Sequence, residues 1–567
     1  MKKVLLGNEA IVQGALESGV DFVSAYPGTP SSEIGNIFGE IGKKQGVYFE
    51  FSTNEKTALE AVIGASFSGL KCLVAMKSFG INVASDALLP FVYTGTKGPV
   101  VIIAADDPSC WSSGQTEENS RAFAYLGHIP ILEPSDAQEA KDFVKLGFEI
   151  SEKFNIPVIV RTTTRVAHQR MPVEINPKLQ IPNSKKKGIF IKDVKRFATM
   201  PPRVLEMKQE LLEKIEKIRA YAEKSKTNRD PGLGKFTETR VSGKLGIITS
   251  GISYLYVKEV LEEFNLDIPI LKLGFFYPLP EKKISFFVRD LKKVLIVEEL
   301  EGYLEKEVKA LVKETSPKLK IYGKDLLPEV GELNSEKVAS AIAKLINKNL
   351  ESNLTGNSPA GIRENWKLKI PNRFPRLCPN CPYWFVFSTV KEVAPKNTIF
   401  GGDIGCYMIA GFPPHNIQDY LLCMGASIGV GHGIKKALQR GSGQDSDQKL
   451  IAFIGDSTFF HSGIPALINT VYNKSNPLII IMDNRITAMT GHQPNPGMGL
   501  TGTLEPAEEI KIEEIVKACG VKNLKVIDPK NIDEFKQTVR EFLNKDEVSV
   551  IVAKRICAIW GKRRVKK

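Results

Sequence analysis

Oxygen-bearing side chains follow two apolar segments of the chain, and they are the residues best suited to binding a metal ion. The segment KLIAFIGDS carries Asp456 directly after its apolar run, the segment PLIIIMDN ends at Asn484, and Asn484 lies 28 residues after Asp456. A helical stretch through ALINTVYN lies between them, so each apolar segment is predicted to be a strand of one wound sheet. Carboxyl ends of adjacent parallel strands form the ligand crevice of such a sheet, where hard oxygen ligands suit Mg²⁺ together with a diphosphate. We expect the Asp456 carboxylate, the Asn484 amide oxygen and the main-chain carbonyl of Ile486 to bind Mg²⁺; a turn aspartate and a strand-end asparagine without a ligand are the alternative.

Four of the eight cysteines form a second group of candidate ligands. Cys378 and Cys381 make a C-x-x-C, and Cys406 and Cys557 follow in IFGGDIGCYM and KRICAIW. Thiolates bind iron–sulfur clusters and zinc, and a C-x-x-C places two of them on one side of the metal. Eight cysteines in 567 residues are too few for a disulfide scaffold. The remaining four have apolar or small neighbours and are expected to be ordinary thiols: Cys72, Cys110, Cys423 and Cys519.

Alternating strands and helices must position these residues. From residue 4 to about 164, strand-like runs such as CLVAMK and PVVIIAADD alternate with helical stretches such as KTALEAVIGASFSGL, which predicts a parallel sheet covered by helices. Further α/β units begin at KLGIITSG and near the C-x-x-C. The expected organisation is an α/β domain at 1–175, a charged connector at 176–243, a smaller α/β domain at 244–348, a linker at 349–377 and a third α/β domain at 378–567.

Composition restricts the class of protein. The chain is 43% apolar and 25% charged with a formal charge of +13, which excludes collagen-like, mini-protein and disordered classes. The start MKKVLLGNEA does not resemble a signal peptide and no apolar run of membrane-spanning length follows, so a cytoplasmic protein without membrane association is expected. The basic excess gathers in 185–243 and in the tail KRRVKK without interleaved aromatic residues, so solvated charged faces are expected and nucleic-acid binding is not.

The spacing around Asp456 resembles the thiamine diphosphate motif, usually G-D-G with an asparagine partner; here it reads Gly455-Asp456-Ser457. A small residue at the third position still permits close backbone approach. The segments LLGNEAIVQGALESGVDFVSAYPGTPSSEI, LKLGFFYPLPE and GDSTFFHSGIPALINTVYNKSN are similar to the large subunit of the indolepyruvate ferredoxin oxidoreductases, within the 2-oxoacid ferredoxin oxidoreductases. The similarity runs from residue 4 to about 560. It implies two doubly wound thiamine-diphosphate-binding domains, of pyrimidine type and diphosphate type, flanking a smaller domain like the transketolase C-terminal domain.

Further site residues follow from this resemblance. In the family, a glutamate before a helix rich in small residues protonates the aminopyrimidine ring of the cofactor, and STNEKTALEAVIGASFSG points to Glu55; a first-turn helix acid is the alternative. Thr29 in YPGTPSSE resembles the substrate-contacting threonine, although prolines and glycine make any such segment a turn. Met424 and Gly425 in LLCMGASIGVGHG resemble a cofactor-supporting segment, and Met424 as an ordinary core residue is the alternative.

The resemblance also implies the reaction. Cys378, Cys381, Cys406 and Cys557 resemble the ligands of one 4Fe-4S cluster, and zinc is the chemical alternative. The implied activity is oxidative decarboxylation of an indolepyruvate-like aryl 2-oxo acid, with CoA, to acyl-CoA and CO₂. Electrons pass to a separate ferredoxin, and a smaller subunit completes a dimer of heterodimers. A non-redox thiamine-dependent decarboxylase or ligase, and an inactive regulatory relative, remain open as alternatives.

Two departures from the family pattern and three further residues complete the sequence-based predictions. The usual C-P-G-C-P-H reads C-P-N-C-P-Y, with Tyr383 in place of the histidine, and the sequence ends ten residues after Cys557, without the family's ferredoxin-like tail and its clusters. His461 and His492 lie beside the cofactor motif and are candidates for substrate contact or structural polar residues. Arg121 is a candidate for binding a carboxylate or a CoA phosphate, with a surface ion pair as the equal alternative.

Overall fold

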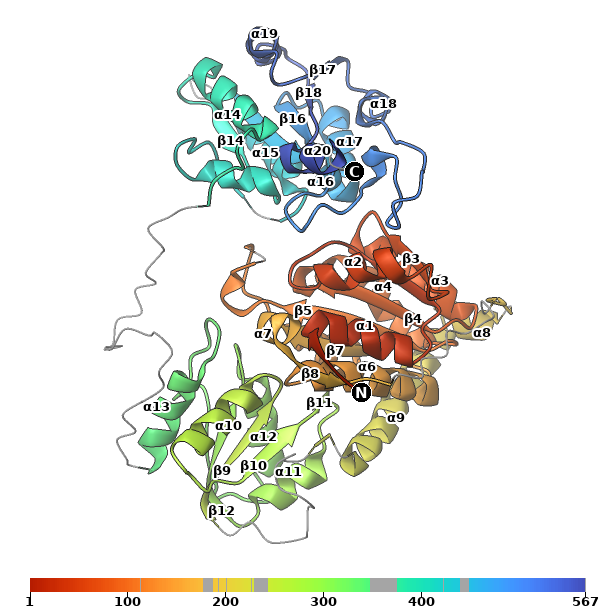
Figure 1. Ribbon diagram of the computed structural model, residues 1–567, viewed down its shortest axis with the longest axis vertical. Helices are drawn as coiled ribbons and strands as arrows, with labels where there is room; N and C mark the ends of the chain where they lie inside the picture. The colour runs from red at the N-terminus through yellow and green to blue at the C-terminus, as the bar shows by residue number, and fades with distance from the viewer. Residues whose placement is uncertain are drawn as a thin grey trace. The chain divides into compact units, whose positions relative to one another are not determined.

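The computed structural model describes residues 1–112, 114–176, 187–191, 193–199, 201–225, 227–228, 243–346, 375–421, 423–438 and 448–565. Much of the expected connector at 176–243 and nearly all of the expected linker at 349–377 lie outside these residues. The chain forms two compact units, Met1–Ala360 and Gly361–Lys567 (Figure 1). Both are mixed α/β structures with parallel sheets, as the alternation of apolar and helical segments predicts.

The first unit contains a seven-stranded sheet in the order β11-β6-β7-β5-β4-β2-β3, parallel except for the edge strand β11. Apolar runs bounded by turns form its strands because both faces of the sheet are covered. The strands are β2 (Phe22–Ala25), β3 (Tyr48–Phe51), β4 (Cys72–Lys77), β5 (Val100–Asp106), β6 (Ile131–Leu132), β7 (Val158–Thr163) and β11 (Phe275–Tyr277). A small antiparallel pair, β1 (Lys2–Leu6) and β8 (Arg170–Glu174), is separate from this sheet.

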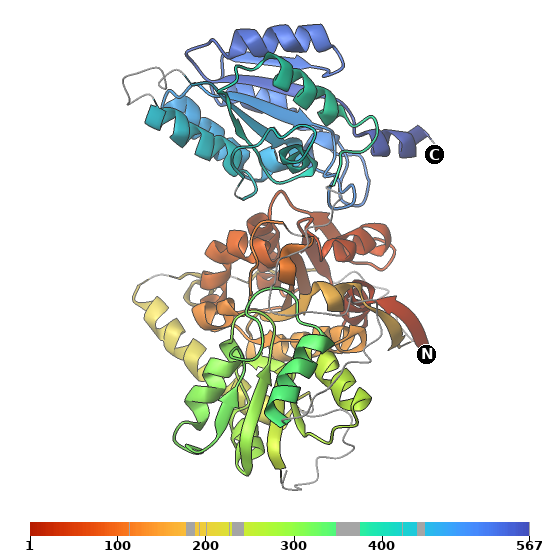
Figure 2. The same ribbon diagram turned by 90° about the vertical axis from the view of Figure 1, so that its left-hand side faces the viewer.

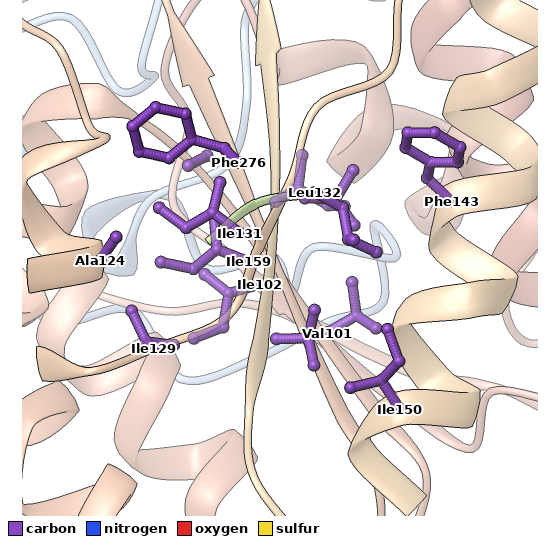
Figure 3. Packing of buried hydrophobic residues seen from close by; sticks show 14 of the residues in the cluster. Val101, Ile102, Ala124, Ile129, Ile131, Leu132, Phe143, Ile150, Ile159 and Phe276 are labelled. Carbon is purple, nitrogen blue, oxygen red and sulfur yellow. The ribbon is translucent and has the colours of Figure 1, made fainter. Parts of the chain in front are cut away.

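Helices cover both faces of the seven-stranded sheet. Figure 3 shows Val101 beside Ile150 of α6 on one face, while Ile102 and Ile131 point to the other face. Successive residues of a strand point to opposite faces, so one apolar run serves both layers. The helices of this part are α1 (Gly7–Glu17), α2 (Ser32–Ile41), α3 (Glu55–Phe67), α4 (Ser78–Thr94), α5 (Ala122–Gly127), α6 (Ala137–Phe154), α7 (Thr164–His168), α8 (Val194–Phe197) and α9 (Arg203–Lys224).

A four-stranded parallel sheet in the order β10-β9-β12-β13 follows in the same unit. Its strands are β9 (Gly243–Ser250), β10 (Ile270–Leu273), β12 (Leu291–Val297) and β13 (Lys320–Tyr322). Its helices are α10 (Ser253–Glu263), α11 (Glu281–Val288), α12 (Tyr303–Val312) and α13 (Ser335–Ile346). Strand β11 belongs to this part of the sequence yet pairs with β6, so the seven-stranded sheet takes its edge strand from beyond residue 243.

The second unit is a five-stranded parallel sheet in the order β14-β15-β16-β18-β17, with helices on both faces (Figure 2). Phe453 of β15 packs on the face that holds α14 and α19, and its neighbour Ile454 packs on the opposite face with α15 and α17. The strands are β14 (Ile399–Gly401), β15 (Leu450–Gly455), β16 (Leu478–Asp483), β17 (Asn523–Ile527) and β18 (Ser549–Lys554). The helices are α14 (Pro382–Val393), α15 (Ala426–Leu438), α16 (Asp456–Thr458), α17 (Ile464–Tyr472), α18 (Ile512–Ala518), α19 (Ile532–Phe542) and α20 (Ala558–Val565).

In the described part of the chain, every helix is too short or too polar to cross a bilayer.

Candidate functional site

The predicted metal ligands lie at one edge of the sheet of the second unit. Strands β15 and β16 are parallel neighbours, Asp456 directly follows the first, and Asn484 directly follows the second. The Asp456 carboxylate accepts a hydrogen bond from Asn495 Nδ2 at 3.0 Å, and Asn484 Oδ1 accepts one from the backbone N–H of Ile486 at 3.0 Å. The structure therefore gathers Asp456, Asn484 and Ile486 as the strand order requires, and it adds Asn495, to which the sequence analysis assigned no role.

The electrostatics of this edge favour a bound cation. Burial, and then the charge of Asp483, raise the pKa of Asp456 to about 8. Burial also raises the pKa of Asp483, although the charge of Arg485 and the Arg485 N–H, which donates to the Asp483 carboxylate at 3.0 Å, oppose the shift. A divalent cation would compensate both carboxylates, so the donor set fits Mg²⁺. The sequence analysis assigned no role to Asp483. Its position directly before the predicted ligand Asn484 is the signal that could have identified it.

The residues around Asp456 show why this motif tolerates a serine. A Cβ on Gly455 would lie 2.6 Å from the Tyr407 ring, so only glycine fits there. Ser457 instead accepts a hydrogen bond from Thr487 Oγ1 at 2.9 Å. The serine hydroxyl thus connects α16, which directly follows β15, to the segment after β16, and a glycine at this position could not make that bond.

Hydrogen bonds to the buried carboxylate of Asp403 fix the turn before α15. Gly425 has φ +92°, and a Cβ there would lie 1.9 Å from Ser462 Oγ, which itself donates to the Met424 carbonyl at 2.8 Å. The Asp403 carboxylate accepts the N–H groups of Gly425 at 2.7 Å and Ser427 at 2.9 Å. The Met424-Gly425 turn is therefore rigid and closely packed. Asp403 positions this turn, and like Asn495 it was not predicted from the sequence.

The structure places the four predicted cysteine ligands in one region of the second unit. The charges of Cys378 and Cys557 affect the pKa of Cys381, and the charges of all three affect the pKa of Cys406. Burial raises the pKa of Cys381 to about 11 and that of Cys406 to about 12, and the neighbouring thiols add to both shifts. Among the described residues, no three His, Cys, Asp or Glu side chains are gathered tightly enough to hold a single metal ion. An all-sulfur donor set from three separate segments fits an iron–sulfur cluster by its chemistry.

Hydrogen bonds connect the cysteine group to the strand ends. The N–H of Cys557 donates to the Asn484 carbonyl at 3.0 Å. Tyr383, which follows the C-x-x-C, is buried and donates to the Met482 carbonyl at 3.2 Å, and its ring lies edge-on to Tyr407 with 6.0 Å between centroids. Tyr383 therefore ties the start of α14 to the end of β16.

The two candidate histidines have different surroundings. His492 Nε2 lies 3.7 Å from Cys557 Sγ, and its ring stacks on Trp560. His461 is buried, with Nδ1 2.9 Å from Ser462 Oγ. His492 is thus beside the cysteine group, and His461 is beside the Met424-Gly425 turn; substrate contact by either stays a prediction.

The first unit holds Glu55 and Thr29 at the carboxyl edge of its seven-stranded sheet. Glu55 is the first residue of α3, it is 3% exposed, and a Cβ on Gly80 would lie 2.7 Å from its Cγ. A helix-start acid with no other role would more commonly face solvent. Thr29 is half-buried in the loop after β2, where Ser31 Oγ donates to the Gly28 carbonyl at 2.8 Å and braces the turn.

Arg121 differs from its sequence-based prediction. Its side chain is buried, with 1% of the residue exposed, and its guanidinium pairs with Glu133 at 2.6 Å and with Glu298 at 2.7 Å. Ser250 Oγ accepts a further hydrogen bond at 2.8 Å. The expected contact with a carboxylate or CoA phosphate, and the alternative of a surface ion pair, are both inconsistent with this burial. Arg121 instead joins the seven-stranded sheet to the four-stranded sheet.

Comparisons with known proteins agree with this architecture. Three family models match: "Pyruvate flavodoxin/ferredoxin oxidoreductase, thiamine diP-bdg" over residues 13–225, "Indolepyruvate oxidoreductase domain" over 235–360, and "Thiamine pyrophosphate enzyme, C-terminal TPP binding domain" over 403–553. The fold and these models define a thiamine-diphosphate-dependent oxidoreductase of 2-oxo acids.

Similar full-length relatives narrow the class further. Indolepyruvate oxidoreductase subunit IorA of Methanothermobacter thermautotrophicus is 43% identical over 98% of this chain and 87% of its own length. The subunit of the same name from Pyrococcus horikoshii is 43% identical over 99% and 86%, and that from Archaeoglobus fulgidus is 40% identical over 99% and 88%. The chain belongs to the indolepyruvate oxidoreductase IorA family, within the 2-oxoacid:ferredoxin oxidoreductases.

Proposed function

We propose that this chain is the large subunit of an enzyme that oxidises an indolepyruvate-like aryl 2-oxo acid, with CoA, to acyl-CoA and CO₂. The observation that carries the proposal is the connection between the two candidate centres of the second unit. The main-chain N–H of Cys557 donates to the main-chain carbonyl of Asn484 at 3.0 Å. One hydrogen bond therefore joins a proposed cluster ligand to a proposed Mg²⁺ ligand. Decarboxylation chemistry and electron removal need such neighbouring centres, since the oxidation of a 2-oxo acid releases electrons that must leave the site.

Thiamine diphosphate, when bound, supplies the electron sink on which a 2-oxo acid can lose CO₂. We assign Asp456, Asn484 and the Ile486 carbonyl to Mg²⁺, and Gly455, Ser457, Met424 and Gly425 to the surroundings of the cofactor. Glu55 would hold a proton at N1′ of the aminopyrimidine, a task suited to a buried carboxyl group. Thr29 is assigned to the substrate, where its hydroxyl can donate to a keto or carboxylate oxygen.

We assign Cys378, Cys381, Cys406 and Cys557 to one 4Fe-4S cluster, which would pass electrons to a separate ferredoxin. The relatives are named as subunits, which supports a smaller partner subunit; a dimer of heterodimers in the cytoplasm is the assembly we propose. His492, at 3.7 Å from Cys557, would be positioned to influence the cluster or the substrate beside it.

Metal and cofactor analysis of the anaerobically purified chain, with and without its co-expressed small subunit, tests the proposal. About four iron atoms with acid-labile sulfide per chain are expected, and zinc without iron would favour the non-redox alternative. Cys406→Ser should lose the iron, whereas Cys519→Ser, at a partly buried thiol outside the group, should retain it.

Thiamine diphosphate binding separates an enzyme from an inactive relative. Wild type should bind the cofactor with Mg²⁺, and Asp456→Ala should not, because it removes the charged ligand. Failure of wild type to bind would contradict both enzyme hypotheses. An anaerobic screen of 2-oxo acids with CoA and a low-potential acceptor then identifies the substrate, and a preference for aliphatic acids would refute the aryl assignment.

A further inference from the structure

Lys77 ends strand β4 at the same sheet edge as Thr29 and Glu55, and the sequence analysis gave it no role. Its aliphatic stem lies across the YPGTP loop: a Cβ on Gly28 would be 2.9 Å from Lys77 Cγ and 3.1 Å from Cδ. Only glycine at position 28 leaves room for this stem. Lys77 therefore lies directly against the residue that precedes Thr29.

The ammonium group of Lys77 contacts two uncharged side chains. Nζ donates to the neutral amide oxygen of Gln115 at 2.7 Å and lies 4.7 Å from the centre of the Phe79 ring. In the part of the chain that the structure describes, Lys77 forms no salt bridge, and the carboxylates near it act through charge at longer range. A cation held by an amide and an aromatic face can accept an anionic ligand without first breaking a salt bridge.

Acidic groups surround Lys77 at longer range. Glu55 on α3 and Asp107, Cys110 and Glu118 in the segment after β5 all act on its charge, yet burial prevails and lowers the pKa of Lys77. Glu118 does not offset the cation fully, because burial and the charge of Asp106 raise its own pKa to about 7. The site thus has a half-buried cation that a bound carboxylate would stabilise.

We propose that Lys77 binds the carboxylate of the 2-oxo acid substrate, with Thr29 beside it for the keto group; the inference rests on the proposed function. All 2-oxo acids carry this carboxylate, and they are anionic at neutral pH. The cation on β4 and the hydroxyl of the loop after β2 come from adjacent parallel strands, so both face the same edge of the sheet.

Direct contact between Lys77 and a carboxylate is tested by removing the positive charge from the protein and, separately, the negative charge from the ligand. The protein variants are Lys77→Met and Lys77→Gln, with Lys97→Met as the control, since Lys97 precedes β5 at the opposite edge of the sheet and binds the Ile189 carbonyl. The probes are 3-phenylpropionate and its uncharged analogue 3-phenylpropionamide, titrated directly into full-length protein by ligand-observed NMR. Neither probe has a keto group, so neither can react.

Wild type and Lys97→Met should prefer the acid over the amide, and Lys77→Met should bind the acid roughly 30-fold more weakly or worse. The affinity for the amide should change by less than about threefold, because no charge pair is lost. In turnover assays of the assembled enzyme, Lys77→Met should raise KM for the 2-oxo acid by a similar factor, with a much smaller change in kcat.

Several results would overturn the assignment. Equal weakening of acid and amide would show that Lys77 only supports the fold of the loop, and an unchanged preference for the acid would place the carboxylate elsewhere. If Lys77→Met fails to fold, Lys77→Gln, which keeps a polar group of similar length, provides the same comparison. If wild type prefers the acid, Lys77→Met loses that preference and the enzyme shows no turnover, the proposed function is refuted while carboxylate binding by Lys77 stays supported.

Discussion

Glu299 offers a pH-dependent test of the buried ionic group that holds the two sheets of the first unit together. The residue lies two positions after the end of β12, is 3% exposed, and accepts the N–H of Leu333 at 3.2 Å. Burial is the largest influence and raises the pKa of Glu299 to about 7, against the lowering effect of the Arg161 charge. The usual value of a glutamate is 4.5.

The raised pKa predicts that ionisation of Glu299 destabilises the folded chain. Below pH 4.5 the carboxyl is protonated in both states, so it contributes nothing. Between pH 4.5 and about 7 the unfolded chain loses the proton first, and the free energy of unfolding falls by about 1.4 kcal/mol for each pH unit. The total loss above pH 7 is about 3 kcal/mol.

Glu299→Gln should remove this loss. The glutamine keeps an oxygen that can accept the Leu333 N–H, and it cannot ionise, so the variant should be more stable than wild type by about 3 kcal/mol at pH 8 and by less than 1 kcal/mol at pH 5. Thermal unfolding of the full chain at the two pH values measures the difference, with an expected gain of about 5 °C at pH 8. Glu314→Gln, an exposed substitution in the same unit, is the control. A gain of equal size at pH 5 and pH 8 would refute the ionisation argument and indicate a packing effect.

Three further substitutions follow from the site. Glu55→Gln should retain thiamine diphosphate binding but lower turnover roughly 100-fold or more, because the amide cannot hold the N1′ proton; wild-type turnover would reject Glu55 as the acid. Gly425→Ala should lower stability by about 1–3 kcal/mol and weaken cofactor binding, since φ +92° and the Ser462 hydroxyl leave no space for a Cβ; melting curves and titration of the cofactor check this, and an unaffected variant would contradict it. Arg121→Met should destabilise the fold by about 3–5 kcal/mol, because buried Glu298 loses the arginine that pairs with it and Glu133 keeps only Arg161; a stable variant with altered CoA affinity would instead support the ligand role.

Much of the fold could be predicted from local pattern. Apolar runs separated by helical stretches are enough to predict parallel sheets, because a strand covered on both faces must be apolar throughout. The spacing from Asp456 to Asn484 was informative for the same reason, since strand, helix and strand return the chain to one edge of the sheet. Connections between the sheets were not predictable in this way: β11 pairs with β6 across more than a hundred residues.

The sequence by itself determined the class of protein, and it predicted metal ligands at two strand ends because motif spacing constrains where neighbouring strands end. Only the tertiary structure decided which charges are paired. It pairs buried Arg121 with Glu298, which lies far from it in sequence, sets Asp403 against the Met424-Gly425 turn, and gives Lys77 an amide as its hydrogen-bond partner. The physical reason is that burial and ion pairing depend on residues brought together by packing, which no local pattern encodes.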